Sequence, residues 1–334
     1  MTTDSTGPRH QLGTDAIHTV WDRSLEPALH VVSGAEIEIQ ALDSSYGGVA
    51  RQVQSGKLAC PEALRGVVLA SAFAVRPNTA DMPGHPLTGP IYVEGAQPGD
   101  TLQVELLEVS TGAWGWNACR PGGIGLLDAE VPEAYTHFWD LRGGVWTDFL
   151  DVARVPLAPF PGVMGVALAE PGRHKTAPPR RVGGNMDVRQ LTAGSTLFLP
   201  VEVEGALLSL GDLHAAQGDG EVSGTGIETD GHVILRVSVL KGQPVGTPHL
   251  QTGPEPTDLW AAGAYVTTGH APDLLEAARI ALRELVLYMG RRYNLSFVQA
   301  YVLASACVDL RISQLVDAPN FTVSALLPNR IFQR

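Results

Sequence analysis

An apolar run that leads directly into a group of ionisable side chains most restricts how this 334-residue chain can fold. Residues 206–210 are apolar apart from one serine, and four ionisable residues follow within the next eleven: Asp212, His214, Asp219 and Glu221. An apolar strand carries such a segment into the interior, where an unpaired carboxylate costs several kcal/mol. A bound metal ion would supply the missing positive charge. The alternative is an acidic surface hairpin, which would not need the apolar run before it.

Composition describes a folded globular protein. Hydrophobic residues make up 44% of the chain and charged residues 17%, and the length allows one large domain or two closely packed ones. A net charge of −12 disfavours nucleic acid and anionic membranes as partners. Cys60, Cys119 and Cys307 are odd in number and scattered, and no signal-peptide or membrane-spanning run is seen. We therefore expect a cytoplasmic protein.

A glycine turn followed by alternating apolar residues recurs along the chain. It is seen at 33–39, 98–104 and 193–199, and a further alternating run covers 232–240. Alternation with a period of two predicts half-buried strands of antiparallel sheets. The sequence therefore predicts a mainly β body, either a β-sandwich or a barrel.

The last third of the chain changes to helical spacing. Apolar residues between Asp273 and Met289 predict a helix that ends at Gly290, and Ser296 is a suitable cap for a second, buried helix through Ala306. We expect three parts: an N-terminal arm (1–28), a mainly β metal-binding body (29–245) and a helical part packed on it (246–334).

Further candidate ligands lie in other glycine- and proline-rich segments. Asp43 follows the first long strand and precedes a Gly-rich loop, where a carboxylate serves a site or caps its own turn. The segment 85–94 contains two prolines and one glycine, which predicts a rigid loop that holds His85 near Glu94. Gly183 and Gly184 precede Asn185 and Asp187 and predict a bend that aims Asp187 inward, although a surface turn explains the same residues.

The nucleophile elbow familiar from serine hydrolases is missing from the sequence, since Gly-X-Ser-X-Gly does not occur. Cys119 stands beside an arginine in a loop-like segment, a setting that can lower a thiol pKa, but we interpret it as an ordinary thiol.

Several of these segments together resemble the acetamidase/formamidase family. The matching segments keep the family's order and are 42–43, 88–100, 161–167, 183–187 and 211–221. The resemblance implies a mainly β fold with α/β elements and hydrolysis of short aliphatic amides, such as formamide or acetamide, to a carboxylic acid and ammonia. It also implies a divalent metal, zinc or alternatively calcium, and a homodimer or higher homo-oligomer.

The chain departs from the family pattern at three places. Val182 stands where relatives often carry histidine, and His85 stands where asparagine is common. The segment 114–146 is rich in tryptophan and is expected to shape a pocket. These departures leave the identity of the amide open.

The residues suggest a division of roles in metal-assisted hydrolysis. A catalytic metal activates water and polarises the carbonyl group, and a carboxylate moves the proton. The candidate metal ligands are Asp43, His85, Asp187, Asp212 and His214. Glu94 and Glu221 are the candidates for the proton shuttle. Asp219 and Asn185 are expected to orient the metal ligands without binding the metal themselves.

Two other classes of protein stay open at this point. One is a cupin-like metal oxygenase or isomerase, which usually spaces two histidines closely on one strand, and no such pair lies near His214. The other is a non-catalytic protein that binds a small ligand, in which the polar cluster is structural. Metal analysis combined with an ammonia-release assay distinguishes all three.

Overall fold

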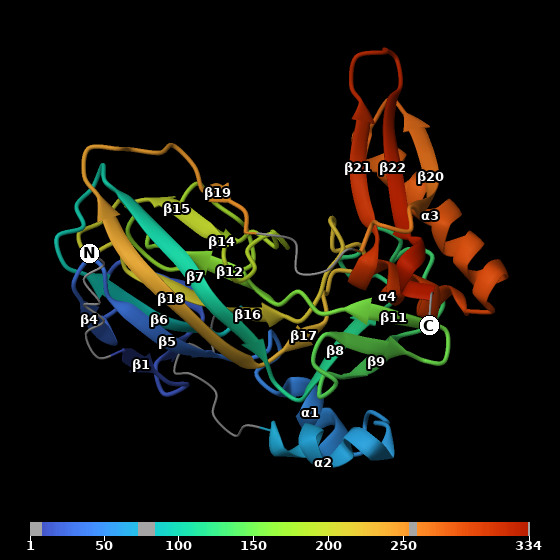
Figure 1. Cartoon of the computed structure of the whole chain (residues 1–334), viewed down its shortest axis with the longest axis horizontal. Coiled ribbons are helices and arrows are strands. Elements are labelled where there is room, and N and C mark those ends of the chain that lie inside the picture. Colours follow the sequence, from blue (N-terminus) through green and yellow to red (C-terminus); the bar gives the residue numbers. More distant parts are fainter. Residues whose placement is uncertain (1–8, 73–83, 254–258, 333–334) are drawn as a thin grey trace. The chain divides into compact units, whose positions relative to one another are not determined.

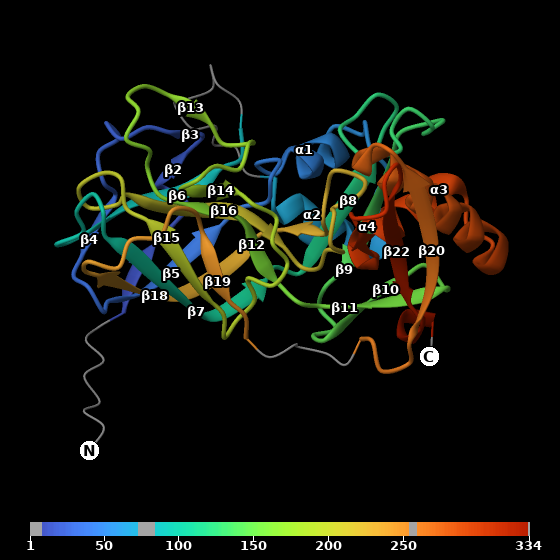
Figure 2. The same cartoon turned by 90° about the horizontal axis from the view of Figure 1, so that it is seen from above.

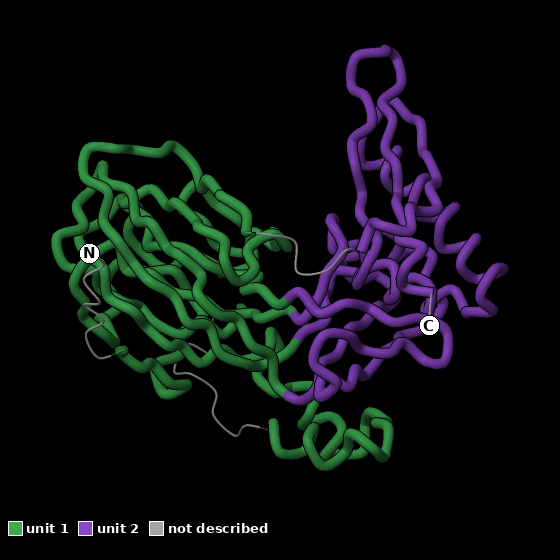
Figure 3. The backbone as a smooth tube through the Cα atoms, in the orientation of Figure 1, with its two compact units in different colours: residues 1–112, 159–214, 229–254 green, residues 113–158, 215–228, 255–334 purple. Residues whose placement is uncertain are grey.

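The computed structural model describes residues 9–72, 84–253 and 259–332, so residues 1–8 of the predicted N-terminal arm lie outside the described residues. The chain forms two compact units (Figure 3), each built from three segments. Unit 1 contains residues 1–112, 159–214 and 229–254, and unit 2 contains residues 113–158, 215–228 and 255–334. The predicted body, 29–245, therefore contributes to both units. Strand pairing between distant segments, which a linear division of the chain cannot show, is the reason for this difference.

Unit 1 contains a six-stranded sheet (Figure 1). Its strands, in spatial order, are β1 (His10–Leu12), β5 (Glu36–Ala41), β18 (Gly231–Leu240), β7 (Thr101–Thr111), β15 (Thr196–Pro200) and β19 (His249–Gln251). Only the β1–β5 pair is parallel. All four runs predicted from alternation lie in this sheet, which confirms the mainly β, antiparallel character of the body.

A second group of paired strands in unit 1 carries the candidate site residues. In spatial order it contains β14 (Gly183–Asn185), β12 (Phe160–Gly165), β16 (Leu208–His214) and β6 (Leu87–Val93). On the edge of β6 that does not face β16, two short strands pair with it: β2 (Ile17–His18) and β4 (Leu29–Val31). Figure 2 shows β2, β6 and β16 side by side. We call this group the site sheet. Apolar residues of both sheets form one core, so unit 1 is a sandwich and not a closed barrel over the part of the chain described.

Short elements complete unit 1. Strands β3 (Val20–Trp21) and β13 (His174–Lys175) pair with each other, and helices α1 (Gly48–Gln54) and α2 (Glu62–Ala70) follow β5. The predicted rigid loop at 85–94 is wrong, because residues 87–93 form strand β6.

Unit 2 combines hairpins with the C-terminal helices. Strands β8 (Trp114–Cys119) and β9 (Tyr135–Asp140) pair, as do β10 (Trp146–Phe149) and β11 (Ala153–Pro156), and β17 (Glu228–Thr229) pairs with β8. Strands β20 (Ala264–Ala271), β22 (Phe321–Pro328) and β21 (Asp309–Gln314) form a three-stranded sheet. A short 3₁₀ turn, Asn329–Phe332, follows β22.

The two C-terminal helices confirm the sequence prediction except at one boundary. Helix α3 (Leu274–Tyr293) begins after Asp273, which accepts a hydrogen bond from the Glu276 amide, but it continues through Gly290 and ends at Asn294 in the left-handed conformation. Gly290 is close to the returning chain, since a Cβ there would lie 3.1 Å from the Leu295 carbonyl oxygen. Helix α4 (Phe297–Cys307) is buried and starts with a capping box at Ser296. No helix among the described residues is long and apolar enough to cross a membrane.

The tryptophan-rich segment belongs to the core of unit 2. Trp139 is fully buried and donates a hydrogen bond from Nε1 to Asn117 Oδ1 at 2.9 Å, and Trp114 and Trp116 are also buried. The His137 ring contacts both Trp139 and Phe149, with ring centroids 4.7 and 4.4 Å away. Burial lowers the pKa of His137 to about 4. Because these aromatic residues pack against one another, they stabilise the core of unit 2.

We predict that acid destabilises unit 2 through His137. Its pKa is about 4 in the folded state and about 6.5 when exposed, so the unfolded chain binds more protons between these values. Stability is thus retained above pH 6.5 and falls by up to about 3 kcal/mol as pH drops toward 4. Denaturant unfolding across this pH range should show that the free energy of unfolding falls less in His137→Phe than in the natural sequence. Equal pH dependence of the two proteins would contradict the prediction.

Candidate functional site

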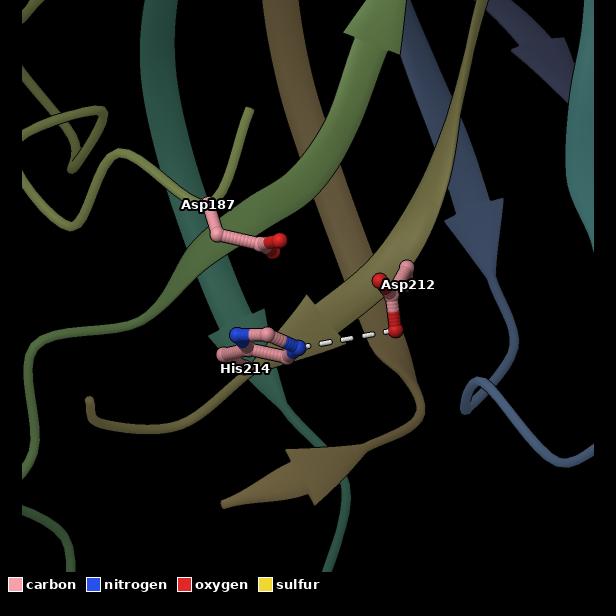
Figure 4. A group of neighbouring side chains, drawn as sticks. All are labelled: Asp187, Asp212 and His214. Atoms are coloured by element: carbon pink, nitrogen blue, oxygen red, sulfur yellow. Dashed lines mark ion pairs between the residues drawn. The ribbon is translucent and has the colours of Figure 1, made fainter. Parts of the chain in front are cut away.

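Asp187, Asp212 and His214 converge in unit 1 (Figure 4). One ligand atom from each residue lies within 4.8 Å of the other two. Asp212 and His214 are almost completely buried, with 3% and 0% exposure, and Asp187 is half-buried. The structure thus brings together three of the five metal ligands proposed from the sequence. We call these three residues the Asp–Asp–His cluster.

Strand β16 supplies two members of the cluster. Asp212 and His214 are two residues apart, the spacing that places side chains on the same face of a strand. The His214 Nε2 atom lies 3.5 Å from Asp212 Oδ1. The imidazole ring packs edge-on against Phe160, its register partner on β12, with centroids 5.2 Å apart. The apolar run that precedes Asp212 is the buried part of this strand.

A sharp bend after β14 supplies Asp187. Gly183 and Gly184 have φ values of +94° and +105°, which L side chains rarely adopt, and the amides of Met186 and Asp187 both donate to the Gly162 carbonyl oxygen. The glycine pair therefore bends the chain so that Asp187 sits beside β12.

Gly162 makes room for both carboxylates. A Cβ atom at this position would lie 2.6 Å from Asp187 Oδ1 and 3.2 Å from Asp212 Oδ2. Asp187 and Asp212 themselves have φ values of +49° and +56°. Left-handed backbone at two non-glycine residues of one cluster costs about 1–3 kcal/mol each, and such strain concentrates at functional sites.

His85 flanks the cluster but does not join it. Its Nε2 atom lies 3.8 Å from Asp212 Oδ2, so the two oxygens of Asp212 face different imidazoles. Its buried Nδ1 has no hydrogen-bond partner among the described residues, and the same holds for Asn185 Oδ1. Asn185 is the register partner of Val163 on β12, next to the cluster along the sheet.

Asp43 is held in its own turn. One oxygen accepts a hydrogen bond from the Gly47 amide at 2.6 Å and the other from the Ser45 hydroxyl at 2.5 Å. The carboxylate therefore caps the turn before α1, which is the alternative considered from sequence. The structure does not place Asp43 in the cluster. It lies near Asp230 instead, whose pKa is raised by burial and by the charge of Asp43.

The two candidate shuttles are placed very differently. Glu94 is exposed and directly follows β6, whereas His85 lies two residues before the strand begins. The seven residues of β6 therefore separate Glu94 from His85 by roughly 20 Å or more. The expectation that His85 and Glu94 lie together is therefore wrong. Glu221 is half-buried in unit 2, with a φ of +43°, and Asp219 belongs to the same segment.

Sequence reasoning missed two buried polar residues of the site sheet. Ser209 lies three residues before Asp212 on β16, and its hydroxyl is 2.9 Å from Nε2 of His18 on β2. The serine in the apolar run of β16 was the only signal in the sequence.

The fold and the cluster define a mainly β protein with a buried carboxylate–imidazole site of the kind used in hydrolysis. The acetamidase/formamidase family model matches residues 4–173 and 167–334. The chain therefore belongs to the acetamidase/formamidase family and is an amidohydrolase.

Individual relatives agree with this assignment. A formamidase of Methylophilus methylotrophus is 29% identical, with 95% of this chain and 89% of that protein aligned. Among solved structures, a γ-lactamase from Delftia acidovorans is 28% identical at a TM-score of 0.80, covering 96% of this chain and 90% of its own. An acetamidase from Bacillus halodurans is 31% identical at a TM-score of 0.61, and the match covers 95% of this chain and 96% of the acetamidase.

We predict that Gly162→Ala disables the site while the fold is retained. The new methyl group must displace the carboxylates of Asp187 and Asp212, and a misplacement of about 1 Å can cost about 10²-fold in rate. The measurement is amide hydrolysis together with far-UV circular dichroism. Gly246→Ala is the matched control, because nothing lies within 4 Å of its Cβ position. Normal turnover in Gly162→Ala would show that the position of these carboxylates is unimportant.

Proposed function

We propose that this protein hydrolyses short aliphatic amides, such as formamide or acetamide, to the carboxylic acid and ammonia with the help of a divalent metal ion. The Asp–Asp–His cluster carries the proposal, because two carboxylates with ligand atoms within 4.8 Å of each other repel unless a cation lies between them. The names of the relatives, a formamidase and an acetamidase, support this class of substrate.

The donor set suits zinc. Asp187, Asp212 and His214 would hold the ion, which matches the three protein ligands of a typical catalytic zinc site. Calcium prefers oxygen ligands only, so the imidazole of His214 favours zinc over calcium. When bound, the ion activates water and polarises the amide carbonyl group.

The chain's own residues then orient the ligands and move the proton. The two carboxylate oxygens of Asp212 orient the imidazoles of His214 and His85, whose Nε2 atoms lie 3.5 and 3.8 Å from Oδ1 and Oδ2, respectively. We assign the proton shuttle to Glu221, seven residues after His214 along the chain, in place of the exposed Glu94. Its task is to take a proton from the attacking water and to return one to the departing nitrogen.

The state of the cysteines supports a mechanism without a thiol nucleophile. Burial raises the pKa of the Cys119 thiol to about 12, and the nearby Asp128 adds to this effect. The pKa of Cys60 is also raised by burial. A thiol with a raised pKa is protonated at neutral pH and is a poor nucleophile.

The γ-lactamase match, with its TM-score of 0.80, favours a second candidate. A cyclic amide contains the same bond as a linear amide, and its opening releases an amino acid instead of ammonia. An assay on a five-membered lactam beside acetamide separates the two classes.

We further propose a cytoplasmic homo-oligomer. The three cysteines are free thiols, as is usual in a reducing compartment. Exposed apolar side chains at the end of the β21–β22 hairpin support contacts between copies of the chain: Ile312, Leu315 and Val316.

We predict that the purified protein contains a divalent metal and that a chelator abolishes ammonia release from formamide or acetamide. His214→Ala should lose metal and activity together, because it removes the only imidazole of the cluster. His174→Ala is the control, since the His174 ring lies at the surface, where it hydrogen-bonds the Glu170 carbonyl oxygen and is not part of the cluster. Elemental analysis of an active preparation checks the claim. Full activity in metal-free protein would refute it.

We predict opposite outcomes for Glu221→Gln and Glu94→Gln. Loss of a group that only moves protons lowers turnover about 10²–10⁴-fold and leaves the metal content unchanged. Glu221→Gln should show this behaviour, whereas Glu94→Gln should keep normal turnover because Glu94 is exposed at the far end of β6. The readouts are steady-state kinetics and metal stoichiometry. A normal rate in Glu221→Gln would remove Glu221 from the mechanism.

A further inference from the structure

His18 and Ser209 form a buried hydrogen bond that spans three strands of the site sheet. Strand β2 pairs with one edge of β6 and strand β16 with the other (Figure 2). The hydrogen bond joins side chains of the two outer strands across β6. His18 Nε2 lies 2.9 Å from Ser209 Oγ, and His18 Nδ1 lies 2.8 Å from the Val20 carbonyl oxygen. A carbonyl oxygen only accepts, so Nδ1 carries the proton and Nε2 accepts from the serine hydroxyl.

The bond lies where the backbone ladder between β6 and β16 is irregular. Leu208 pairs with Ile91 and Leu210 with Thr88, so Gly89 and Pro90 both lie opposite Ser209. Pro90 has no amide hydrogen to donate. A Cβ on Gly89 would lie 2.5 Å from Ser209 Oγ, so only glycine leaves room for the hydroxyl. The side-chain bond therefore ties the strands together where a bulge interrupts the ladder.

The register of β16 decides where the cluster stands. Asp212 and His214 follow Ser209 on this strand after three and five residues. A slip of one residue would turn both side chains to the opposite face of the sheet. On its other edge β16 pairs with β12, and Gly162 of that strand faces both carboxylates. Small shifts of β16 thus change the distances among the three ligand residues.

We propose that His18 and Ser209 are positioning residues, which clamp β16 at the bulge and so hold Asp212 and His214 in place for metal binding. The proposal rests on the metal-dependent function proposed above. Both residues are buried, with exposures of 6% and 1%, so neither is placed to contact a substrate.

A serine bound to an imidazole is also the arrangement of an activated nucleophile. The burial of Ser209 argues against this role. Burial also lowers the pKa of His18 to about 4, which makes it a weak base at neutral pH. The nucleophile is therefore an outcome that the experiment must be able to reveal.

The test compares Ser209→Ala with Ser195→Ala in the full-length protein. Ser195 is a matched control, because it is also 1% exposed and its hydroxyl also makes one buried hydrogen bond, to the Thr192 carbonyl oxygen, but it lies beside β15 in the other sheet. The readouts are the melting temperature, the zinc dissociation constant from competition with a chelator, kcat, and hydrogen exchange of the β16 amides in metal-free protein.

We expect similar melting temperatures for the two variants but about 10–100-fold weaker zinc binding only in Ser209→Ala, with faster amide exchange over residues 210–214. His18→Gln should keep part of the zinc affinity, because its amide oxygen still accepts from Ser209, whereas His18→Leu should not. Unchanged zinc affinity and exchange in Ser209→Ala would overturn the clamp. Total loss of turnover with unchanged zinc affinity would instead identify Ser209 as a nucleophile. If the natural protein binds no zinc while exchange still rises in Ser209→Ala, the proposed function fails and the strand clamp stands.

Discussion

The burial of the Asp212 carboxylate is the constraint on which the rest of unit 1 depends. A carboxylate that is 3% exposed has lost most of its hydration, which costs several kcal/mol unless positive charge or donors replace water. Two imidazoles face its two oxygens, and the carboxylate of Asp187 stands close by. A second negative charge increases the need for a cation. This is the reason for which we propose that the cluster binds a metal ion.

The sandwich supplies the rigidity that such a group needs. Two non-glycine residues of the cluster have left-handed backbone, and this strain persists only when the surrounding structure enforces it. The enforcement comes from β12, which pairs with β14 on one side and β16 on the other. The carboxylates of both neighbours meet over its Gly162, the one position of the strand that must lack a side chain for this purpose. Two of the three ligand residues therefore lie on strand β16 and the third lies two residues after β14, so strands position the ligands as precise placement requires.

Alternation of apolar residues was enough to predict the strands β5, β7, β15 and β18, since each has one face on the core and one face toward solvent. The apolar run before Asp212 likewise predicted that Asp212 and His214 are carried into the interior, and both are buried. Local patterns failed where distant segments decide the structure. Gly89 and Pro90 were read as loop residues, but they sit in a bulge of β6 opposite Ser209. Gly290 was read as a helix end, but it makes room for the chain at Leu295. The role of Asp43 depended on its hydrogen bonds to Ser45 and Gly47, which no spacing rule could show.

The central claim is that Asp187, Asp212 and His214 together bind the metal on which hydrolysis depends. Anomalous diffraction at the zinc absorption edge, from crystals of active zinc-containing protein, tests it most directly. The account predicts one anomalous peak at about 2.0–2.2 Å from a carboxylate oxygen of each aspartate and from an imidazole nitrogen of His214. An anomalous peak at another position, with these three side chains turned away from it, would contradict the account.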